Sequence, residues 1–416
     1  MENEWSKVKL VDIIQFNPKE SIKKGEIAKK VAMEKLEPFT RKISGFEEAK
    51  FTSGSKFRNG DTLLARITPC LENGKTAQVD ILDKDEIGFG STEYIVLREK
   101  LGITDNDFIY YLSISPEFRN VAIKAMNGSS GRQRVQKDVL ENSEFLLPPL
   151  DEQKAIAKIL SDLDEKIETN NKINKKLEEM AQAIFKQWFI DFEFPNEDGK
   201  PYKSSGGEMV ESELGMIPKG WETKKMEEVC VRINSGGTPS RKKEEYYGGD
   251  IPWLKTKELL DNFIFNSEEY ITEKGLKESS AKVFPRNTVL MAIYASPTVG
   301  KLGIASSDVT FNQAMCGMVT NENMLCYEYL YLFLLKERIN LNNLASGSAQ
   351  QNLSVTTIKN YTILVPNIEL IKQFKNVISN AFIKIENNSL ENIRLSNIRD
   401  SILPKLMSGE IRVPID

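Results

Sequence analysis

The stretch FLLPPLDEQKAIAKIL, residues 145–160, decides how this chain of 416 residues is organised. A short apolar run ends at two prolines, and the charged start of a helical pattern follows. Proline has no backbone N–H, so the pair stops the run. Acidic residues in a first turn interact favourably with the helix dipole. The stretch therefore predicts the exit from one domain and a long helix from about Asp151 to about Trp188.

The same kind of junction recurs near the C-terminus as PNIELIKQFKNVISNAFIKI, residues 366–385. Alignment of Pro148 with Pro366 gives an offset of 218 residues. The offset holds without a gap over more than fifty residues, and it pairs Gln133 with Gln351 at one end. Self-similarity at a fixed offset is typical of repeated structural units. The sequence therefore predicts two similar halves.

Apolar residues spaced four and three apart run through both helical segments, which is the spacing of a coiled-coil seam. Asn170 and Asn174 interrupt the first seam at the points where Asn388 and Asn392 interrupt the second. A buried Asn costs stability but penalises misregistered pairings. We expect the helices to pack as an antiparallel coiled coil with these four residues setting its register. The alternative is two amphipathic helices that each cover their own domain.

Four segments follow from these patterns: 1–147, 148–215, 216–365 and 366–416. The first and third are predicted to be similar mixed domains, because short β-rich runs such as TLLARI and NTVLMAIY alternate with helical stretches such as YEYLYLFLLKERI. The second holds one long helix and a linker rich in Gly, Pro, Ser and acids, and the fourth holds the other helix. The predicted fold class is α/β (α+β), with a pseudo-two-fold internal repeat.

Composition excludes several classes of function. The chain contains no histidine, which removes Ser-His-Asp and Cys-His nucleophiles and HExxH metal sites. Its four cysteines form no CxxC pair, so we expect packed thiols and no metal site. Neither a long apolar run nor a signal-peptide pattern occurs, so we expect no membrane span and a cytoplasmic location.

Catalytic motifs are incomplete. NGKTA at 73–77 contains the GKT of a phosphate loop, but Pro69 stands where the first glycine is needed. GFGSTE at 88–93 lacks the glycines of a dinucleotide fingerprint and is expected to form a tight turn. The only Pro-Pro is followed by Leu150, so the catalytic loop of an amino-methyltransferase is missing. We expect no catalytic residue on this chain.

Polar loops that combine basic, amide and small side chains occur in both halves. Arg and Lys bind guanine, Asn and Gln bind adenine, and Ser, Thr and glycine amides suit phosphate oxygens. For a single residue the alternative is mere solvation, and the pattern does not separate base contacts from phosphate contacts. The candidate DNA contacts are Arg66, Thr68, Lys75, Arg132, Gln133 and Arg134 in the first half and Thr238, Ser240, Arg241, Lys242, Lys255, Lys257, Gln350 and Gln351 in the second.

Five longer motifs add a family resemblance. They are LPPLDEQKAIAKILSDLDEKI, WFIDFEFPN, GKPYKSSGGEMVESELGMIPKGW, SGGTPSRKKEEYYGGDIPWLKTKEL and SGSAQQNLS. With them the chain resembles, over essentially its whole length, the DNA-sequence specificity (S) subunit of type I restriction-modification systems. The resemblance implies two target-recognition domains, each reading one half of a bipartite site in double-stranded DNA, and two helical spacers.

The same resemblance implies partner chains that carry the chemistry. Two methyltransferase subunits would dock on this chain and modify adenine with S-adenosylmethionine, and restriction subunits would use ATP and Mg; no cofactor is expected on this chain. Residues 148–215 hold 9 Lys and Arg against 15 Asp and Glu, so their exposed face suits protein partners better than DNA. The second junction reads VPNIELIKQ where the first has PPLDEQ, so docking on the two halves is expected to be unequal.

Two other functions compete with this interpretation. A coiled-coil adaptor would organise proteins without touching DNA, and it predicts no salt-dependent binding to a duplex. A self-sufficient methyltransferase or nuclease predicts that the purified chain modifies or cuts DNA by itself. The recognised sequence, its spacer length and the presence of restriction subunits are not contained in these patterns.

Overall fold

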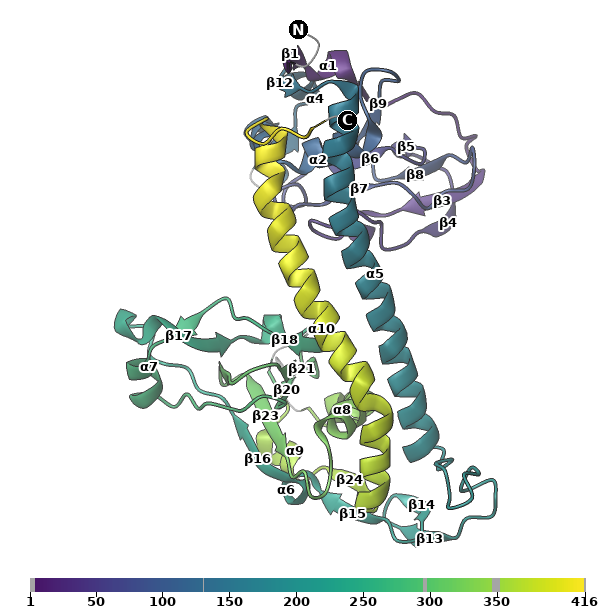
Figure 1. Cartoon of the computed structure of the whole chain (residues 1–416), viewed down its shortest axis with the longest axis vertical. Helices are drawn as coiled ribbons and strands as arrows, with labels where there is room; N and C mark the ends of the chain where they lie inside the picture. Colours follow the sequence, from purple (N-terminus) through teal and green to yellow (C-terminus); the bar gives the residue numbers. More distant parts are fainter. Residues whose placement is uncertain (1–3, 130, 295–297, 346–351, 415–416) are drawn as a thin grey trace. The chain divides into compact units, whose positions relative to one another are not determined.

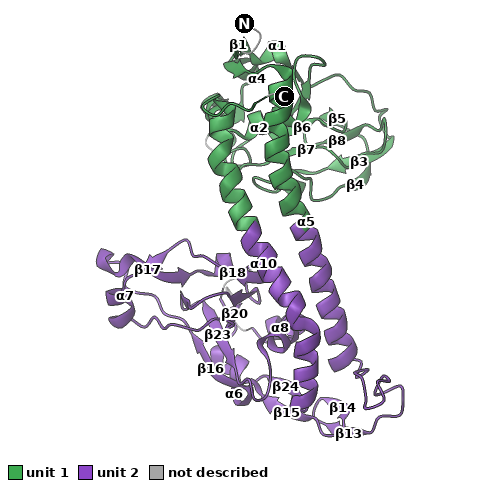
Figure 2. Ribbon diagram, in the orientation of Figure 1, with its two compact units in different colours: residues 1–169, 392–416 green, residues 170–391 purple. Residues whose placement is uncertain are grey.

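A computed structural model describes residues 4–129, 131–294, 298–345 and 352–414. The chain divides into two compact units (Figure 2). The first unit comprises residues 1–169 and 392–416, and the second comprises residues 170–391. The unit boundaries cut through the two long helices, so each helix contributes to both units. The division into four segments at 147, 215 and 365 remains a prediction.

The repeat is visible in the bounds of the long helices (Figure 1). Helix α5 (Leu150–Phe189) and helix α10 (Ile368–Met407) both have 40 residues, and their ends are related by the offset of 218. The elements before them follow the same rule: these are α4 (Lys137–Glu141), β12 (Glu144–Leu147), α9 (Val355–Lys359) and β24 (Thr362–Val365). The predicted repeat and the mixed fold class are confirmed.

The first unit contains two four-stranded sheets beside short helices. Their strand orders are β2-β9-β6-β7 and β4-β3-β8-β5. The pairs β1-β12 and β10-β11 complete its strands. The bounds are β1 (Ser6–Lys9), α1 (Leu10–Ile13), β2 (Ile14–Phe16), β3 (Ile27–Val31), η1 (Met33–Lys35), β4 (Glu47–Lys50), β5 (Lys56–Phe57), β6 (Thr62–Ala65), β7 (Thr76–Gln78), β8 (Gly88–Gly90), β9 (Tyr94–Glu99), α2 (Asn106–Ile114), α3 (Pro116–Lys124), β10 (Met126–Asn127) and β11 (Arg134–Val135).

The expectation of a tight turn at GFGSTE was wrong for its first three residues. Gly88–Gly90 form strand β8, which pairs with β3 and β5. A Cβ atom at Gly90 would lie 2.6 Å from the carbonyl oxygen of Val31, so no side chain fits there. The glycines therefore allow close approach of neighbouring backbone, which is the other common role of glycine in a strand.

The second unit contains a five-stranded sheet of order β16-β23-β20-β21-β18 and a three-stranded sheet of order β19-β17-β22. Part of the expected linker forms the hairpin β13-β14, and β15 pairs with β24. The bounds are β13 (Met209–Ser212), β14 (Gly215–Pro218), β15 (Glu222–Lys225), α6 (Met226–Val229), β16 (Cys230–Ser235), η2 (Glu244–Tyr246), β17 (Tyr247–Leu254), η3 (Thr256–Glu258), β18 (Asn262–Ile264), β19 (Tyr270–Ile271), α7 (Glu273–Lys277), β20 (Val289–Ala292), β21 (Leu302–Ala305), β22 (Thr310–Phe311), β23 (Met315–Thr320) and α8 (Tyr327–Asn343).

The two long helices pack on each other in opposite directions. In the first unit the start of α5 meets the end of α10, where Asp164 contacts Arg399. In the second unit the end of α5 meets the start of α10, where Phe185 and Phe189 pack on Phe374. The predicted antiparallel pairing is confirmed.

Asparagines lie within this helix pair. Nδ2 of Asn388 donates to Oδ1 of Asn174 at 2.8 Å, and Nδ2 of Asn170 donates to Oε2 of Glu391 at 2.8 Å. Asn170, Asn174 and Asn388 are buried, whereas Asn392 is half-buried. Buried amides that bond across two helices favour one register, because a slip would leave them without partners.

Candidate nucleic-acid interface

In the first unit, the loop between β6 and β7 lies against the β10-β11 hairpin. The amide of Thr68 donates to the carbonyl of Gln133 at 3.0 Å, and the amide of Val135 donates to the carbonyl of Arg66 at 2.8 Å. Nη2 of Arg66 also donates to the carbonyl of Val135 at 3.2 Å. The fold therefore brings Arg66, Thr68, Gln133 and Arg134 together from segments more than fifty residues apart.

Arg134 is held by a carboxylate. Its Nη2 donates to Oε1 of Glu93 at 2.7 Å and its Nε donates to Oε2 at 2.9 Å. These hydrogen bonds keep the pKa of Glu93 below its ordinary value, and they raise the pKa of Arg134. A planar guanidinium with a bidentate partner is fixed in direction. Arg134 is 44% exposed, so it combines a defined orientation with access to a ligand.

The other candidate side chains of this unit differ in whether their polar groups already have hydrogen-bond partners. Nζ of Lys75 donates to the carbonyl of Met33 at 2.9 Å, and the hydroxyl of Thr68 donates to Oε1 of Glu72 at 2.9 Å. Both side chains therefore stabilise the loop itself. Arg132 is exposed, and no described residue makes a polar contact with its side chain. Among these candidates, Arg132 is best placed to reach a phosphate.

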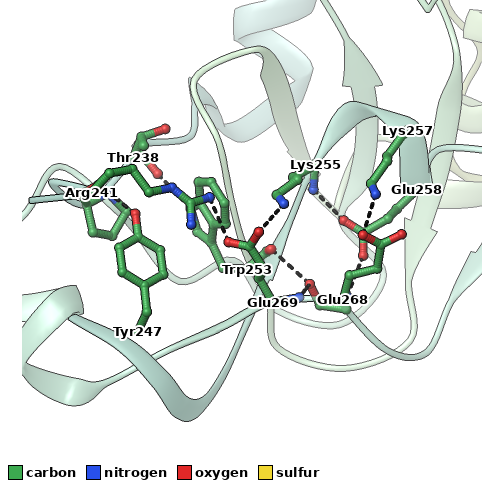
Figure 3. A network of polar contacts seen from close by, with 12 residues as sticks. Thr238, Arg241, Tyr247, Trp253, Lys255, Lys257, Glu258, Glu268 and Glu269 are labelled. Atoms are coloured by element: carbon green, nitrogen blue, oxygen red, sulfur yellow. Dashed lines mark hydrogen bonds and ion pairs between the residues drawn. The ribbon is translucent and has the colours of Figure 1, made fainter. Parts of the chain in front are cut away.

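In the second unit, Arg241 and Lys255 lie near the aromatic rings of Tyr247 and Trp253 (Figure 3). The Arg241 guanidinium lies 4.3 Å from the ring centroid of Tyr247 and 4.9 Å from that of Trp253. Its Nη2 lies 2.6 Å from Oε2 of Glu269. Lys255 forms an ion pair with the other oxygen of Glu269. A cation over aromatic faces with a carboxylate partner has little rotational freedom.

The scaffold of this site is a set of side-chain to backbone hydrogen bonds. Nε1 of Trp253 donates to the carbonyl of Gly237 at 2.9 Å, and the hydroxyl of Tyr247 donates to the carbonyl of Pro239 at 2.6 Å. A Cβ atom at Gly237 would lie 2.3 Å from the backbone of Ser280. The SGGTPS loop is therefore anchored against β17, with Thr238 bound to Gln313.

Opposite charges balance in this cluster, which we call the Glu269 network; it comprises Arg241, Lys255, Lys257, Glu258, Glu268 and Glu269. Lys257 forms an ion pair with Glu268, and Glu258 accepts from the amide of Lys255. Burial raises the pKa of Glu269, but hydrogen bonds from Lys255 and Arg241 outweigh burial and hold that pKa below its ordinary value. The ion pairs of the Glu269 network therefore hold its basic side chains in fixed positions. Because its charges balance, the network has no net positive charge that would attract DNA.

Two neighbours of the network are free of such partners. Ser240 and Lys242 are exposed, and within the described ranges neither side chain has a polar contact. Gln350 and Gln351 lie outside the described residues. Sequence reasoning missed Tyr247, Trp253 and Glu269. The aromatic residues of EYYGGDIPW, which lie between the basic ones, are the signal that could have indicated Tyr247 and Trp253. No local signal indicated Glu269.

Other kinds of site are not found in the described part of the chain. No group of His, Cys, Asp and Glu side chains there is placed to hold a metal ion. Cys230, Cys316 and Cys326 are buried free thiols, as expected, whereas the free thiol of Cys70 is only half-buried. Burial raises the pKa of Cys230 and of Cys316 to about 12. Among the described residues, no helix combines the length and apolarity needed to cross a membrane.

Known proteins resemble this chain over most of its length. A family model described as "Type I restriction modification DNA specificity domain" matches residues 2–179 and again residues 218–396. The HindI type I restriction enzyme specificity subunit of Haemophilus influenzae is 28% identical over 424 residues, covering 89% of this chain and 90% of that protein. The MjaIX specificity subunit of Methanocaldococcus jannaschii is 28% identical, covering 74% of this chain and 69% of that protein.

A solved structure shares the fold. The type I restriction-modification S subunit from M. genitalium matches with a TM-score of 0.59 at 15% identity. The match covers 97% of this chain and 96% of that one. The architecture of two similar halves joined by long helices is therefore shared although most side chains differ.

Proposed function

The chain belongs to the type I restriction modification DNA specificity family, and from this premise we propose that its two halves read the two parts of a bipartite sequence in double-stranded DNA. The observation that carries the proposal is the double match of one DNA specificity domain, once in each half. Residues 1–147 and 216–365 would be the two target-recognition domains, and residues 148–215 and 366–416 the spacers. The family match supports neither a DNA-independent adaptor nor a self-sufficient enzyme.

The proposed DNA surface of each half is the loop cluster described above. In the first half it centres on Arg132 and Arg134, and in the second half on Arg241 and Lys242. Support comes from their chemistry: an oriented guanidinium suits a base edge, and an exposed free cation suits a phosphate. Arg66, Thr68, Lys75 and Lys255 would act mainly by shaping the loops, because their polar groups already have partners.

The proposed partners carry the chemistry. Two methyltransferase subunits that use S-adenosylmethionine on adenine would dock on the spacers, and restriction subunits that use ATP and Mg would join them in the cytoplasm. This chain would be non-catalytic, since its only Pro-Pro is followed by Leu150 and the catalytic loop of an amino-methyltransferase is missing. The excess of acids in residues 148–215 favours protein contacts there, because DNA phosphates are repelled by carboxylates.

Methylation mapping tests the proposal. Genomic DNA from cells that express this chain with its methyltransferase partner should carry methyladenine in a motif of two short specified parts separated by unspecified bases. Cells that express the partner alone are the control and should lack that motif. A continuous, undivided motif would contradict two separate readers, and an unchanged methylation pattern would contradict a role in DNA specificity.

A further inference from the structure

A buried ion pair joins the two halves of the chain inside the first unit. Nη1 of Arg399 on α10 lies 2.6 Å from Oδ1 of Asp164 on α5, and both side chains are less than a tenth exposed. The hydroxyl of Tyr111 donates to the other carboxylate oxygen at 2.8 Å. A buried charge with matched hydrogen bonds is tolerated, whereas the same charge without its partner is strongly destabilising.

A second ion pair joins the halves near the start of α5. Nε of Arg412 donates to Oε1 of Glu152 at 2.7 Å, and Nη2 donates to Oε2 at 2.7 Å. Nε1 of Trp5 donates to the same carboxylate at 3.0 Å. The Glu152 side chain is 1% exposed, so its charge also depends on these partners.

The offset of 218 shows what occupies the corresponding positions of the second unit. Asp164 corresponds to Phe382 and Arg399 to Ala181; both are buried, and both line a cavity of about 240 Å³. Glu152 corresponds to Leu370, and Arg412, five residues beyond the end of α10, corresponds to Phe194. Leu370 and Phe194 are buried too and line one cavity. Each charged pair of one unit is thus an apolar pair in the other.

This asymmetry matters because a repeated helix can pair with a second copy of itself. If two copies of α5 met in the same antiparallel register, Asp164 would face Ala181 and Glu152 would face Phe194. If two copies of α10 met, Arg399 would face Phe382. Self-pairing of α5 would bury Asp164 and Glu152 without a counter-ion from the facing helix, and self-pairing of α10 would leave Arg399 with only the exposed Asp400 of its own helix. Burial of a charge without its counter-ion is costly.

The contact between Asn174 and Asn388 does not make this distinction. Asn174 would meet Asn170 between two copies of α5, and Asn388 would meet Asn392 between two copies of α10, so an amide pair can form in each. Asn170 differs, because its partner Glu391 corresponds to Ile173. The Asn174–Asn388 contact can fix the register, but it leaves the partner undecided. The choice of partner must come from positions at which the two halves differ.

We propose that the pairs Asp164–Arg399 and Glu152–Arg412 restrict each long helix to the helix of the opposite half and exclude association with a second copy of itself. Each long helix can thus pair with the helix of the opposite half, but not with a second copy of itself, although the sequence repeat would otherwise allow both. The inference concerns assembly of the chain and stands whether or not the proposed DNA function is correct.

The test uses a full-length variant in which the two charged pairs of the first unit are replaced by the apolar residues found at the corresponding positions of the second unit. The variant is Asp164→Phe, Arg399→Ala, Glu152→Leu and Arg412→Phe. Light and heavy isotope-labelled copies are mixed, unfolded, refolded together and treated with a lysine cross-linker. Lys158 and Lys186 lie about 42 Å apart along one α5 at 1.5 Å per residue. They would face each other only between two self-paired copies.

The expected result is a light-to-heavy Lys158–Lys186 cross-link at least tenfold more abundant in the variant than in the wild type, together with a dimer mass by light scattering. The control is Lys176→Ala with Glu179→Ala, which removes an exposed ion pair within α5 and should behave as the wild type does. Equal cross-link yields in variant and wild type would overturn the proposal.

If the fourfold variant does not refold, a second measurement tests the proposal. Equilibrium unfolding of Asp164→Ala, Arg399→Ala and the double variant gives the coupling between the two side chains. We expect the coupling to change the unfolding equilibrium constant about tenfold, as contacting charged groups do. Additive effects of the two substitutions would show that the pair does not discriminate between partners, and would overturn the proposal.

Discussion

Arg241 and Lys242 are neighbours in the sequence, yet their side chains have different surroundings. Both are exposed, but Arg241 lies over two aromatic rings and is held by Glu269, whereas no described residue makes a polar contact with the side chain of Lys242. A fixed guanidinium can present two parallel donors to the O6 and N7 atoms of guanine, while a free ammonium acts as a point charge beside a phosphate. At the scale of the residue, we therefore expect the two side chains to differ in what they read.

Substitution of each residue separates these roles. In the assembled complex, Arg241→Ala should relax the preference at one base position by about 1–3 kcal/mol when binding sites are selected from random duplexes. Lys242→Ala should keep the selected sequence but weaken binding to every duplex, and the salt dependence should fall by about one counterion. The same response in both variants would contradict the distinction.

At the scale of the element, the long helices use polar groups where apolar ones would pack more strongly. Asn174 and Asn388 bond to each other across the helix pair, and Asp164 bonds to Arg399. Such groups are stabilising only with their partners in place, because a buried polar atom that loses its hydrogen bond keeps its desolvation cost. Removal of one partner should therefore cost more than removal of both.

The asparagine pair offers a direct measurement. Asn388→Ala leaves the amide oxygen of Asn174 without its donor and should lower the free energy of unfolding by about 1–3 kcal/mol in urea titrations. The double substitution of Asn174 and Asn388 by Leu should be less destabilising than the single one, or stabilising. Lys172→Ala, on the exposed face of α5, is the control. A single variant as stable as this control would show that the bond contributes nothing.

We expect Glu152 to make the stability of the first unit sensitive to pH. Hydrogen bonds from Arg412 hold the pKa of Glu152 below its ordinary value of 4.5. A depressed carboxyl pKa contributes stability that is complete above 4.5 and is lost as the pH falls through the folded value. The melting temperature of the wild type should therefore drop more steeply below about pH 5 than that of Glu152→Gln. Parallel curves, with Glu117→Gln as the exposed control, would contradict this.

At the scale of the whole molecule, the proposal gives the chain a recognition surface in each half and leaves catalysis to other chains. Its membership of the DNA specificity family assigns it the reading of DNA. The proposed division of labour places the transfer of methyl groups on partner chains. Within the described residues no side-chain group is placed to bind a catalytic metal ion.

Assays of the isolated chain test that division. The purified chain, incubated with duplex DNA, S-adenosylmethionine, ATP and Mg, should leave the DNA unmethylated and uncut. Addition of the methyltransferase partner should start methylation of adenine. Methylation or cleavage by the chain alone, in a preparation shown by mass spectrometry to be free of the partner, would contradict a non-catalytic role.

The sequence by itself determined the repeat, the long helices and their antiparallel pairing. Helix spacing and prolines are signals that a short window of sequence contains. The repeat is found by comparing two segments of the sequence directly, at an offset of 218. The predicted helix from about Asp151 to about Trp188 ends within one residue of α5 on both sides. The same rules misread Gly88–Gly90, whose conformation depends on neighbouring strands.

Only the tertiary structure decided which polar side chains meet. Glu269 is 28 residues from Arg241, and Asp164 is 235 residues from Arg399, so no local pattern links them. The polar loops were predicted as a group, but their division into oriented, structural and free side chains depends on contacts between distant strands. A short spacing rule describes the faces of one element, whereas hydrogen bonds and ion pairs between elements depend on how the whole chain packs.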